Sequence, residues 1–197
     1  KRQLPFLPKR LGIATSPTGA AVRDIIKVAL RRFPNIEIII APAKVQGDDA
    51  PASIAGAIAE LNRPELNIDV IIAGRGGGSF EDLFAFNEEI VVRAFYKSRV
   101  PIISAVGHQI DHPLCDDAAD VAAPTPSAAA EIAVPQKKDL SDEITYLHNR
   151  MFTALMNSYT RDKTRLKNVV SKKVFRDPHE IVNFRSMLLN EMENRIS

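Results

Sequence analysis

Two short segments contain the residues whose types and spacing could do chemistry. One is the glycine-rich run at residues 74–79, GRGGGS, and the other holds His108 and Asp111, three positions apart. Backbone N–H groups of a glycine-rich turn can hold an anion, and the guanidinium of Arg75 offers forked donors to phosphate oxygens. A carboxylate beside an imidazole orients it and raises its basicity, which suits a general acid or base. Together the two segments predict chemistry at a phosphate group.

Neither segment is diagnostic by itself. The glycine spacing lacks the last glycine of the dinucleotide-binding fingerprint, and no Lys-Ser/Thr pair follows it as in a P-loop. A tight turn without a ligand is therefore an equal alternative, and a His-x-x-Asp pair is most often structural. His112 is a second histidine that could compete for the role.

Several residues carry oxygen or nitrogen atoms that could bind Mg²⁺ or Mn²⁺. They are Asp24, His108, Asp111, Asp116, Asp117 and Asp120. No spacing among them is diagnostic, so the sequence assigns no metal ligand and leaves Mg²⁺ as the one cofactor to test. The acidic cluster at Asp116, Asp117 and Asp120 is interpreted first as turn and cap residues.

The elements around the two segments predict how they are positioned. Residues 68–73 and 101–106 are apolar, β-branched runs that read as buried strands, and residues 80–97 between them have helical periodicity. Strands joined in this way pair in parallel, so both segments fall at the carboxyl edge of one sheet, where ligands bind. Upstream, the pattern predicts strands at 11–15 and 36–41 and helices at 20–33 and 51–62. The fold class is therefore α/β, a mostly parallel open sheet with flanking helices, Rossmann-like, over residues 11–134.

The two ends of the chain have a different character. Residues 1–10 are basic and proline-broken and read as a linker into the domain. From about residue 138 glycine disappears and an apolar stripe recurs at helical spacing, with a break at Asp177-Pro178. Residues 135–197 are therefore predicted to form a helical hairpin, a coiled-coil arm whose stripe needs a partner, either a second copy or small helical subunits. We place an N-cap at Ser127, where a further helix starts.

Composition limits the class of protein. With 45% apolar residues the chain can build a core, and no run of about 18 apolar residues or charged-then-apolar leader predicts a membrane span or a signal peptide. The single cysteine, Cys115, excludes a disulfide scaffold and fits the reducing cytoplasm. Residues 1–136 carry 14 Lys or Arg against 16 Asp or Glu, whereas residues 137–197 carry 12 against 8, so the basic excess lies in the arm. The aromatic residues between 80 and 96 read mainly as core residues.

Several segments together resemble the large subunit of exodeoxyribonuclease VII. They are residues 14–25 (ATSPTGAAVRDI), 74–83 (GRGGGSFEDL), 86–87 (FN), 104–108 (SAVGH), Asp111, and 123–129 (APTPSAA). The resemblance implies a bacterial exonuclease that hydrolyses phosphodiester bonds of single-stranded DNA to give oligonucleotides. It also implies an OB-type domain that grips the strand, absent from this sequence, and a coiled-coil arm that collects small subunits. The chain is expected to be the catalytic core with part of that arm.

The resemblance assigns roles to individual residues. The implied catalytic set is Asp24, Arg75, His108 and Asp111. Beside that set, the glycine-rich run predicts contacts to phosphate or DNA at Gly76, Gly77, Gly78 and Ser79, and Thr125 and Ser127 are further candidates for such contacts. One departure is Gln109-Ile110, where the family usually has Glu-Thr, and a glutamine cannot act as a base. The alternative function, from another class, is a phosphate- or nucleotide-binding assembly module without catalysis, built around the arm.

Overall fold

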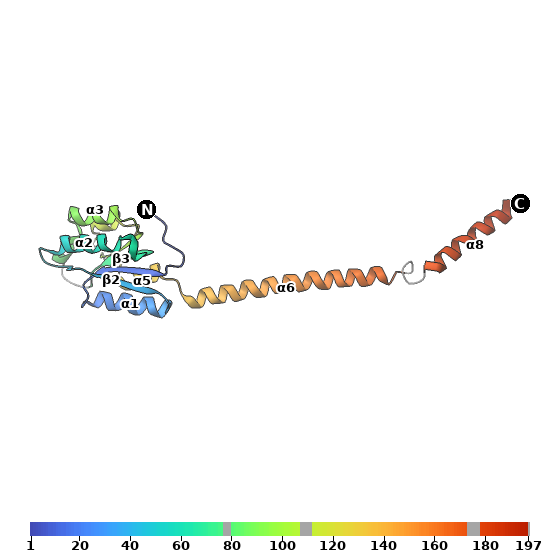
Figure 1. Ribbon diagram of the computed structural model, residues 1–197, viewed down its shortest axis with the longest axis horizontal. Coiled ribbons are helices and arrows are strands. Elements are labelled where there is room, and N and C mark those ends of the chain that lie inside the picture. The colour runs from blue at the N-terminus through green and yellow to red at the C-terminus, as the bar shows by residue number, and fades with distance from the viewer. Residues whose placement is uncertain (77–79, 107–111, 173–177, 197) are drawn as a thin grey trace. The chain divides into compact units, whose positions relative to one another are not determined.

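The computed structural model describes residues 1–76, 80–106, 112–172 and 178–196 (Figure 1). The chain divides into two compact units, Lys1–Ser141 and Asp142–Ser197. The first unit contains a β-sheet with helices on both faces, and the second is helical. In the described residues no helix is long and apolar enough to cross a membrane.

A five-stranded sheet organises the first unit. Its strands are β1 (Arg10–Thr15), β2 (Glu37–Pro42), β3 (Val70–Gly74), β4 (Ile102–Ala105) and β5 (Val121–Ala122). Their spatial order is β2-β1-β3-β4-β5, and every neighbouring pair is parallel. The predicted parallel open sheet is thus confirmed. The strand that the sequence did not predict is β5, because two residues are too short for a periodic signal.

Helices cover both faces of this sheet (Figure 1). One face carries α1 (Ala20–Arg32) and α5 (Pro126–Ala133), whose apolar residues form a core with Leu11 and Ile13 of β1. The other carries α2 (Ala50–Leu61), α3 (Glu89–Lys97) and the short α4 (Leu114–Ala118), which share a second core that includes Ala14. Because successive strand residues point to opposite faces, Thr15 projects to the α1 side, as Ile13 does.

The segment between β3 and β4 differs from its prediction as one helix. It contains a 3₁₀ helix, η2 (Phe80–Phe86), and then α3. The two are separated at Asn87, whose side-chain oxygen accepts a hydrogen bond of 2.7 Å from the backbone N–H of Leu114. A tertiary hydrogen bond therefore interrupts a periodicity that looked continuous. A further 3₁₀ turn, η1 (Pro64–Leu66), precedes β3.

The first residues of the chain are joined to the far end of the sheet. Asp120 accepts hydrogen bonds from the backbone N–H of Arg2 at 2.6 Å and from its guanidinium at 2.7 Å and 3.2 Å. The same carboxylate accepts the backbone N–H of Ile102 at 2.9 Å. Burial raises the pKa of Asp120, but the hydrogen bonds from Arg2 and Ile102 outweigh it and hold that pKa below its ordinary value. Asp120 thus links the N-terminus to β4.

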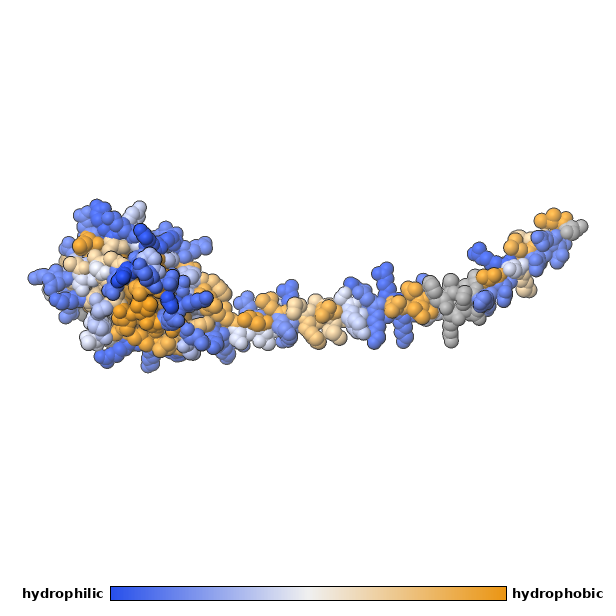
Figure 2. Space-filling view, viewed as in Figure 1, coloured by the Kyte–Doolittle hydropathy of each residue, from blue (hydrophilic) through white to orange (hydrophobic). Residues whose placement is uncertain are grey.

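The second unit consists of α8 (Pro178–Ile196) and most of α6 (Lys137–Val170). Helix α8 restarts at Pro178, where the break was predicted, whereas α6 already ends at Val170. Residues 173–177 lie outside the described part. The apolar stripe is exposed, with Leu155 at 65% and Phe184 at 65% of their full accessibility. Figure 2 shows hydrophobic residues along both helices between hydrophilic ones. The antiparallel pairing of the two helices stays a prediction.

Candidate active site

The sheet has a switch point between β1 and β3. The chain passes from β1 outward to β2 and then returns across β1 to β3, after which it continues to β4 and β5. In open parallel sheets, ligands bind at the carboxyl ends of the two strands that flank such a point. Here those ends are Thr15 of β1 and Gly74 of β3. A site at this edge is therefore expected from the topology alone.

Arg75 follows β3 at this edge and is buried, with 7% of its surface exposed. Its backbone N–H donates to the carbonyl oxygen of Ala105 at 3.3 Å, which extends the pairing of β3 with β4 by one residue. Its Nε donates to the carbonyl oxygen of Gly76 at 3.0 Å. Burial and this hydrogen bond therefore hold the guanidinium close to the end of β3.

Two glycines allow close approach around Arg75. A Cβ at Gly74 would lie 2.4 Å from the carbonyl oxygen of Ala105, a distance that side-chain carbons do not adopt. A Cβ at Gly76 would lie 3.5 Å from the backbone nitrogen of Ala21, so the segment after β3 runs against the start of α1. The glycine-rich segment thus has a packing role in addition to the anion-binding role that its sequence predicts.

A cavity of about 330 Å³ opens beside Arg75. Three segments line this cavity: the end of β1 with the start of α1, the segment after β2, and residues 75–76. The lining residues are Thr15, Ser16, Gly19, Ala20, Ala21, Lys44, Val45, Gln46, Arg75 and Gly76. Gly19 is the N-cap of α1 and supplies no side chain to its first N–H groups. Those N–H groups lack intrahelical partners and give this end of the helix a positive potential.

Two charged side chains near the cavity, Lys44 and Asp24, differ in their partners and in their distance from it. Lys44 forms an ion pair of 2.8 Å with Asp49. The hydrogen bond between them raises the pKa of Lys44 and lowers that of Asp49. Asp24 is exposed on α1, three residues beyond Ala21 and so on the neighbouring turn, but it does not line the cavity. The structure thus brings Arg75 and Gly76 together with the start of α1, and it places Asp24 one turn away.

Five of the predicted site residues lie outside the described residues: Gly77, Gly78, Ser79, His108 and Asp111. Their roles stay predictions. His112 is described, and it is engaged by α4. Its Nε2 lies 3.0 Å from Asp117 and its Nδ1 lies 3.6 Å from Asp116. The hydrogen bond that His112 donates to the Asp117 carboxylate raises the pKa of His112 and so favours its protonated form.

A buried polar cluster lies at the end of β4. The Ser104 hydroxyl is 3.4 Å from the Cys115 sulfur, and burial raises the pKa of the Cys115 thiol to about 12. Burial also raises the pKa of Asp116. A thiol in this environment is a structural residue and not a nucleophile. Among the described residues, no three His, Cys, Asp or Glu side chains are placed to hold a metal ion.

Thr125 and Ser127 follow β5 and so belong to the same edge of the sheet. Thr125 is the N-cap of α5, and its Oγ1 accepts a hydrogen bond of 3.1 Å from the backbone N–H of Ala128. The N-cap predicted at Ser127 is therefore wrong by two residues, because Pro126 occupies the first helical position, where its missing N–H costs nothing. Contact of either residue with DNA stays a prediction.

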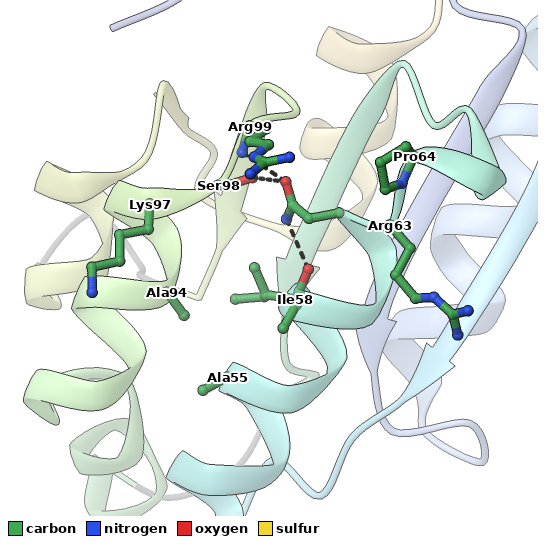
Figure 3. Close-up of a pocket in the computed structure, with 10 residues that line it drawn as sticks. Ala55, Ile58, Arg63, Pro64, Ala94, Lys97, Ser98 and Arg99 are labelled. Atoms are coloured by element: carbon green, nitrogen blue, oxygen red, sulfur yellow. Dashed lines mark hydrogen bonds between the residues drawn. The ribbon is translucent and has the colours of Figure 1, made fainter.

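A second cavity, of about 430 Å³, lies between α2 and α3 (Figure 3). Its floor is apolar, with Ala55, Ile58 and Ala94, and cationic side chains lie around it at Arg63, Lys97 and Arg99. The Asn62 carboxamide accepts from Ser98 and from the backbone of Arg99 and donates to Ile58. This cavity adjoins the C-terminal ends of two helices, whose exposed carbonyls disfavour an anion. The carboxyl-edge cavity, beside a helix N-terminus, is therefore better suited to an anion.

Four polar side chains that line the carboxyl-edge cavity were not predicted as candidates: Thr15, Ser16, Lys44 and Gln46. The signal for Thr15 and Ser16 was present, because they end the first strand just before Gly19 and the helix. The rule that selected Arg75, a polar residue at the carboxyl end of a parallel strand, applies equally to Thr15. Lys44 and Gln46 lie in a loop without a motif and could be found only from the fold.

These features define a doubly wound α/β protein whose carboxyl edge brings an arginine, a helix N-terminus and a cavity together at the switch point. The family model described as "Exonuclease VII, large subunit" matches residues 1–197. The chain therefore belongs to the exonuclease VII large-subunit family, as the resemblance indicated.

Individual relatives agree with this assignment. The exodeoxyribonuclease 7 large subunit of Leptospira interrogans is 54% identical over 196 residues, covering 100% of this chain and 46% of the relative. That of Geotalea daltonii is 46% identical over 195 residues, covering 99% and 43%. The chain thus spans about half the length of the curated relatives it matches. A solved cobalamin-binding protein from Desulfitobacterium hafniense DCB-2 covers 62% of this chain and is itself covered to 56%, with 13% identity and a TM-score of 0.40, too distant to inform function.

Proposed function

We propose that this chain carries the hydrolytic site of a single-strand-specific exodeoxyribonuclease, which cleaves phosphodiester bonds of DNA to give oligonucleotides. The observation that carries the proposal is the buried Arg75 at the switch point, beside the N-terminus of α1 and a cavity, in a chain of the exonuclease VII large-subunit family. Positive groups fixed at such a point suit the charge that develops on phosphorus oxygens during hydrolysis.

Each proposed residue has a chemical role. Water attacks phosphorus, the bond to the 3′ oxygen breaks, and that oxygen takes up a proton. His108 transfers a proton to the leaving oxygen or from the water, and Asp111 orients its imidazole. Arg75 stabilises the phosphoryl charge, and Asp24 is a second acid or base or a metal ligand. Gly76, Gly77, Gly78, Ser79, Thr125 and Ser127 are proposed to contact phosphate or DNA.

Whether hydrolysis requires Mg²⁺ is decided by experiment. Asp24 supplies carboxylate oxygens of the kind that Mg²⁺ prefers. Cleavage of labelled single-stranded DNA with and without EDTA separates metal-assisted hydrolysis from hydrolysis by the side chains alone. Binding without cleavage under both conditions would favour the alternative, a non-catalytic phosphate-binding assembly module.

Substitution of Arg75 tests the proposal at its central residue. Arg75→Lys is expected to lower the cleavage rate strongly, because one ammonium cannot reproduce a forked contact. Arg99→Lys is the matched control: it makes the same exchange at an exposed position of the cavity between α2 and α3, and its rate is expected to stay at the wild-type value. Equal rates for the two variants would refute the assignment of Arg75.

His108→Ala tests the proton carrier. It is expected to lower the rate about 10²-fold or more without loss of folding, as removal of a general acid or base does. His112→Ala is its control, since this neighbouring histidine is already paired with Asp117. A His108→Ala chain with a near wild-type rate, or a larger loss in His112→Ala, would move the role to His112.

We also propose the partners and the compartment. Single-stranded DNA is the substrate, and the exposed stripe of α6 and α8 binds the small subunit of exonuclease VII or a second copy of this chain. The same exposed stripe also fits the alternative function, a non-catalytic assembly module built around the arm. The buried free thiol of Cys115 fits the reducing cytoplasm.

The grip on DNA is proposed to be weak in this chain. Single strands are normally held by a basic groove with aromatic platforms. Residues 1–136 have a net charge of −2, and Phe86 and Phe95 are buried in the core as expected. Phe84 and Tyr96 differ from that expectation, because they are exposed. Binding is expected to be strongly salt-dependent and to tighten when an OB-type domain is attached.

A further inference from the structure

The Thr15 side chain combines burial with an unused hydrogen-bonding group. It is 1% exposed, and its Oγ1 has no hydrogen-bond partner in the part of the chain that the structure describes. It is also the one buried side-chain oxygen or nitrogen found in this condition among those residues. A buried hydroxyl without a partner destabilises the fold, and the partner that satisfies it can be an ordered water or a bound ligand.

The surroundings of Thr15 indicate what that partner is. Its carbonyl oxygen already accepts the backbone N–H of Ala43 at 3.0 Å, whereas its side-chain Oγ1 is left unsatisfied. Strand alternation places that side chain on the α1 side of the sheet, with Ile13. Thr15 lines the same cavity as Ala20 and Ala21, the first residues of the 13-residue helix α1. A hydroxyl and helical N–H groups are all donors, and they suit an anion.

We propose that the Thr15 hydroxyl and the first-turn N–H groups of α1 bind one phosphate group at the switch point, next to Arg75. That this phosphate belongs to a DNA strand rests on the nuclease function proposed above. The cavity volume of about 330 Å³ falls within the range of small-ligand pockets, so it can admit a phosphate with its sugar. The helix contributes positive potential, and its first turn contains no acidic residue to oppose it. Thr15 is a binding residue and carries no proton-transfer role.

Lys44 is a weaker candidate than Thr15 for holding the phosphate. Its ammonium is exposed and already paired with Asp49, so it lies at the rim as a screened charge. Thr15 and the helix N-terminus instead form the inner wall. The phosphate affinity is therefore expected to depend on a neutral hydroxyl more than on the nearest lysine.

The test replaces the hydroxyl while keeping the shape of the side chain. Thr15→Val substitutes a methyl group of the same size, Thr15→Ser keeps the hydroxyl, and Thr18→Val is the matched control at an exposed turn position outside the cavity. Affinity is measured by calorimetric titration of the 197-residue chain with inorganic phosphate and with a short single-stranded oligothymidylate. The amide resonances of Ala20 and Ala21 report where the ligand binds.

Thr15→Val is expected to weaken both affinities about tenfold or more, the loss expected for one hydrogen bond to a charged group, while Thr15→Ser and Thr18→Val stay near wild type. Without ligand, the melting temperature of Thr15→Val is expected to equal or exceed the wild-type value, because the unsatisfied hydroxyl is gone. A structural role for this hydroxyl predicts the opposite change. Affinity and melting temperature together therefore distinguish a ligand-binding role of the hydroxyl from a structural one.

Three results would overturn the proposal. They are wild-type phosphate affinity in Thr15→Val, absence of saturable phosphate binding in the wild type, and a lowered melting temperature of unliganded Thr15→Val. Thr15-dependent binding of inorganic phosphate but not of the oligothymidylate would overturn the assignment to DNA. A cleavage assay with the small subunit is read separately: Thr15-dependent binding without cleavage would refute the nuclease function and leave the phosphate site standing.

Discussion

Replacing Gly74 by alanine is expected to separate the two strands that carry the proposed site. The new Cβ would lie 2.4 Å from the carbonyl oxygen of Ala105, against an ordinary contact of 3.4 Å or more, so the ends of β3 and β4 must move apart by about 1 Å. The atoms that would have to yield are backbone and the Cβ of Ala105, and no flexible side-chain end can give way instead. The strain therefore falls on the strand pairing itself.

The cost follows from two terms. Forcing a carbon into a well-packed place costs about 1–3 kcal/mol. The hydrogen bond from the Arg75 N–H to Ala105 is already 3.3 Å long and would be lost, at about 0.5–1.5 kcal/mol. Gly74→Ala is therefore expected to lower the free energy of unfolding by about 1.5–4.5 kcal/mol. Because Arg75 is the next residue, a shift of this size is also expected to lower the cleavage rate by about 10²-fold.

Gly56→Ala is the matched control. A Cβ at Gly56 would meet nothing within 4 Å, and this glycine lies inside α2. The exchange is expected to raise stability by about 0.5–1 kcal/mol, because alanine loses less conformational entropy in a helix. Urea unfolding followed by circular dichroism measures both variants, and cleavage of labelled single-stranded DNA is assayed in parallel. Equal stability of the two variants would refute the packing argument. A destabilised Gly74→Ala chain with a wild-type rate would show that the β3–β4 spacing does not position Arg75.

Three other predictions concern the cap, the N-terminal link and the arm. Thr125→Ala should lower the free energy of unfolding by about 1 kcal/mol, with Thr125→Ser close to wild type in the same denaturant titration, because only the hydroxyl caps α5. Asp120→Asn should cost about 1–3 kcal/mol near neutral pH and flatten the acid limb of the stability profile. The lowered pKa of Asp120 stabilises the fold above the ordinary carboxyl pKa, and this stabilisation is lost as pH falls through the lowered value; unfolding across pH with an unchanged acid limb would contradict it. Leu147→Asp should abolish association through the arm while Asn149→Asp, which adds the same charge two residues away, should not, and equal sedimentation of the two variants with the small subunit present would count against this.

The sequence was sufficient for the part of the fold that rests on local pattern. The β-branched runs before Arg75 and before residue 107 correspond to β3 and β4, and the carboxyl-edge rule places Arg75 at the switch point. Helix α1 begins at Ala20 as expected. These features are predictable because burial of a strand on both faces leaves a continuous apolar run, which a single sequence displays.

The rest depends on contacts between distant residues. The pairing of Arg2 with Asp120 spans 118 positions, and neither residue has a local signal of it. The hydrogen bond from Leu114 to Asn87 divides a segment that has one continuous helical period. Thr15 ends β1 and was within reach of the carboxyl-edge rule, but the burial of its hydroxyl without a partner is a property of packing and not of sequence. Lys44 and Gln46, which lie in a loop without a motif, are recognised as lining the cavity only from the fold.

The two edges of the sheet limit how copies of this protein can join. β5 is two residues long, too short to template a strand from another chain, and β2 ends in Pro42, which has no N–H to offer. Short edge strands and edge prolines are the means by which proteins prevent uncontrolled strand addition. Growth of the sheet into a fibre is thereby discouraged at both sides. We therefore expect any assembly to use helical surfaces, where side-chain shape, and not the generic pattern of the backbone, decides which partner is accepted.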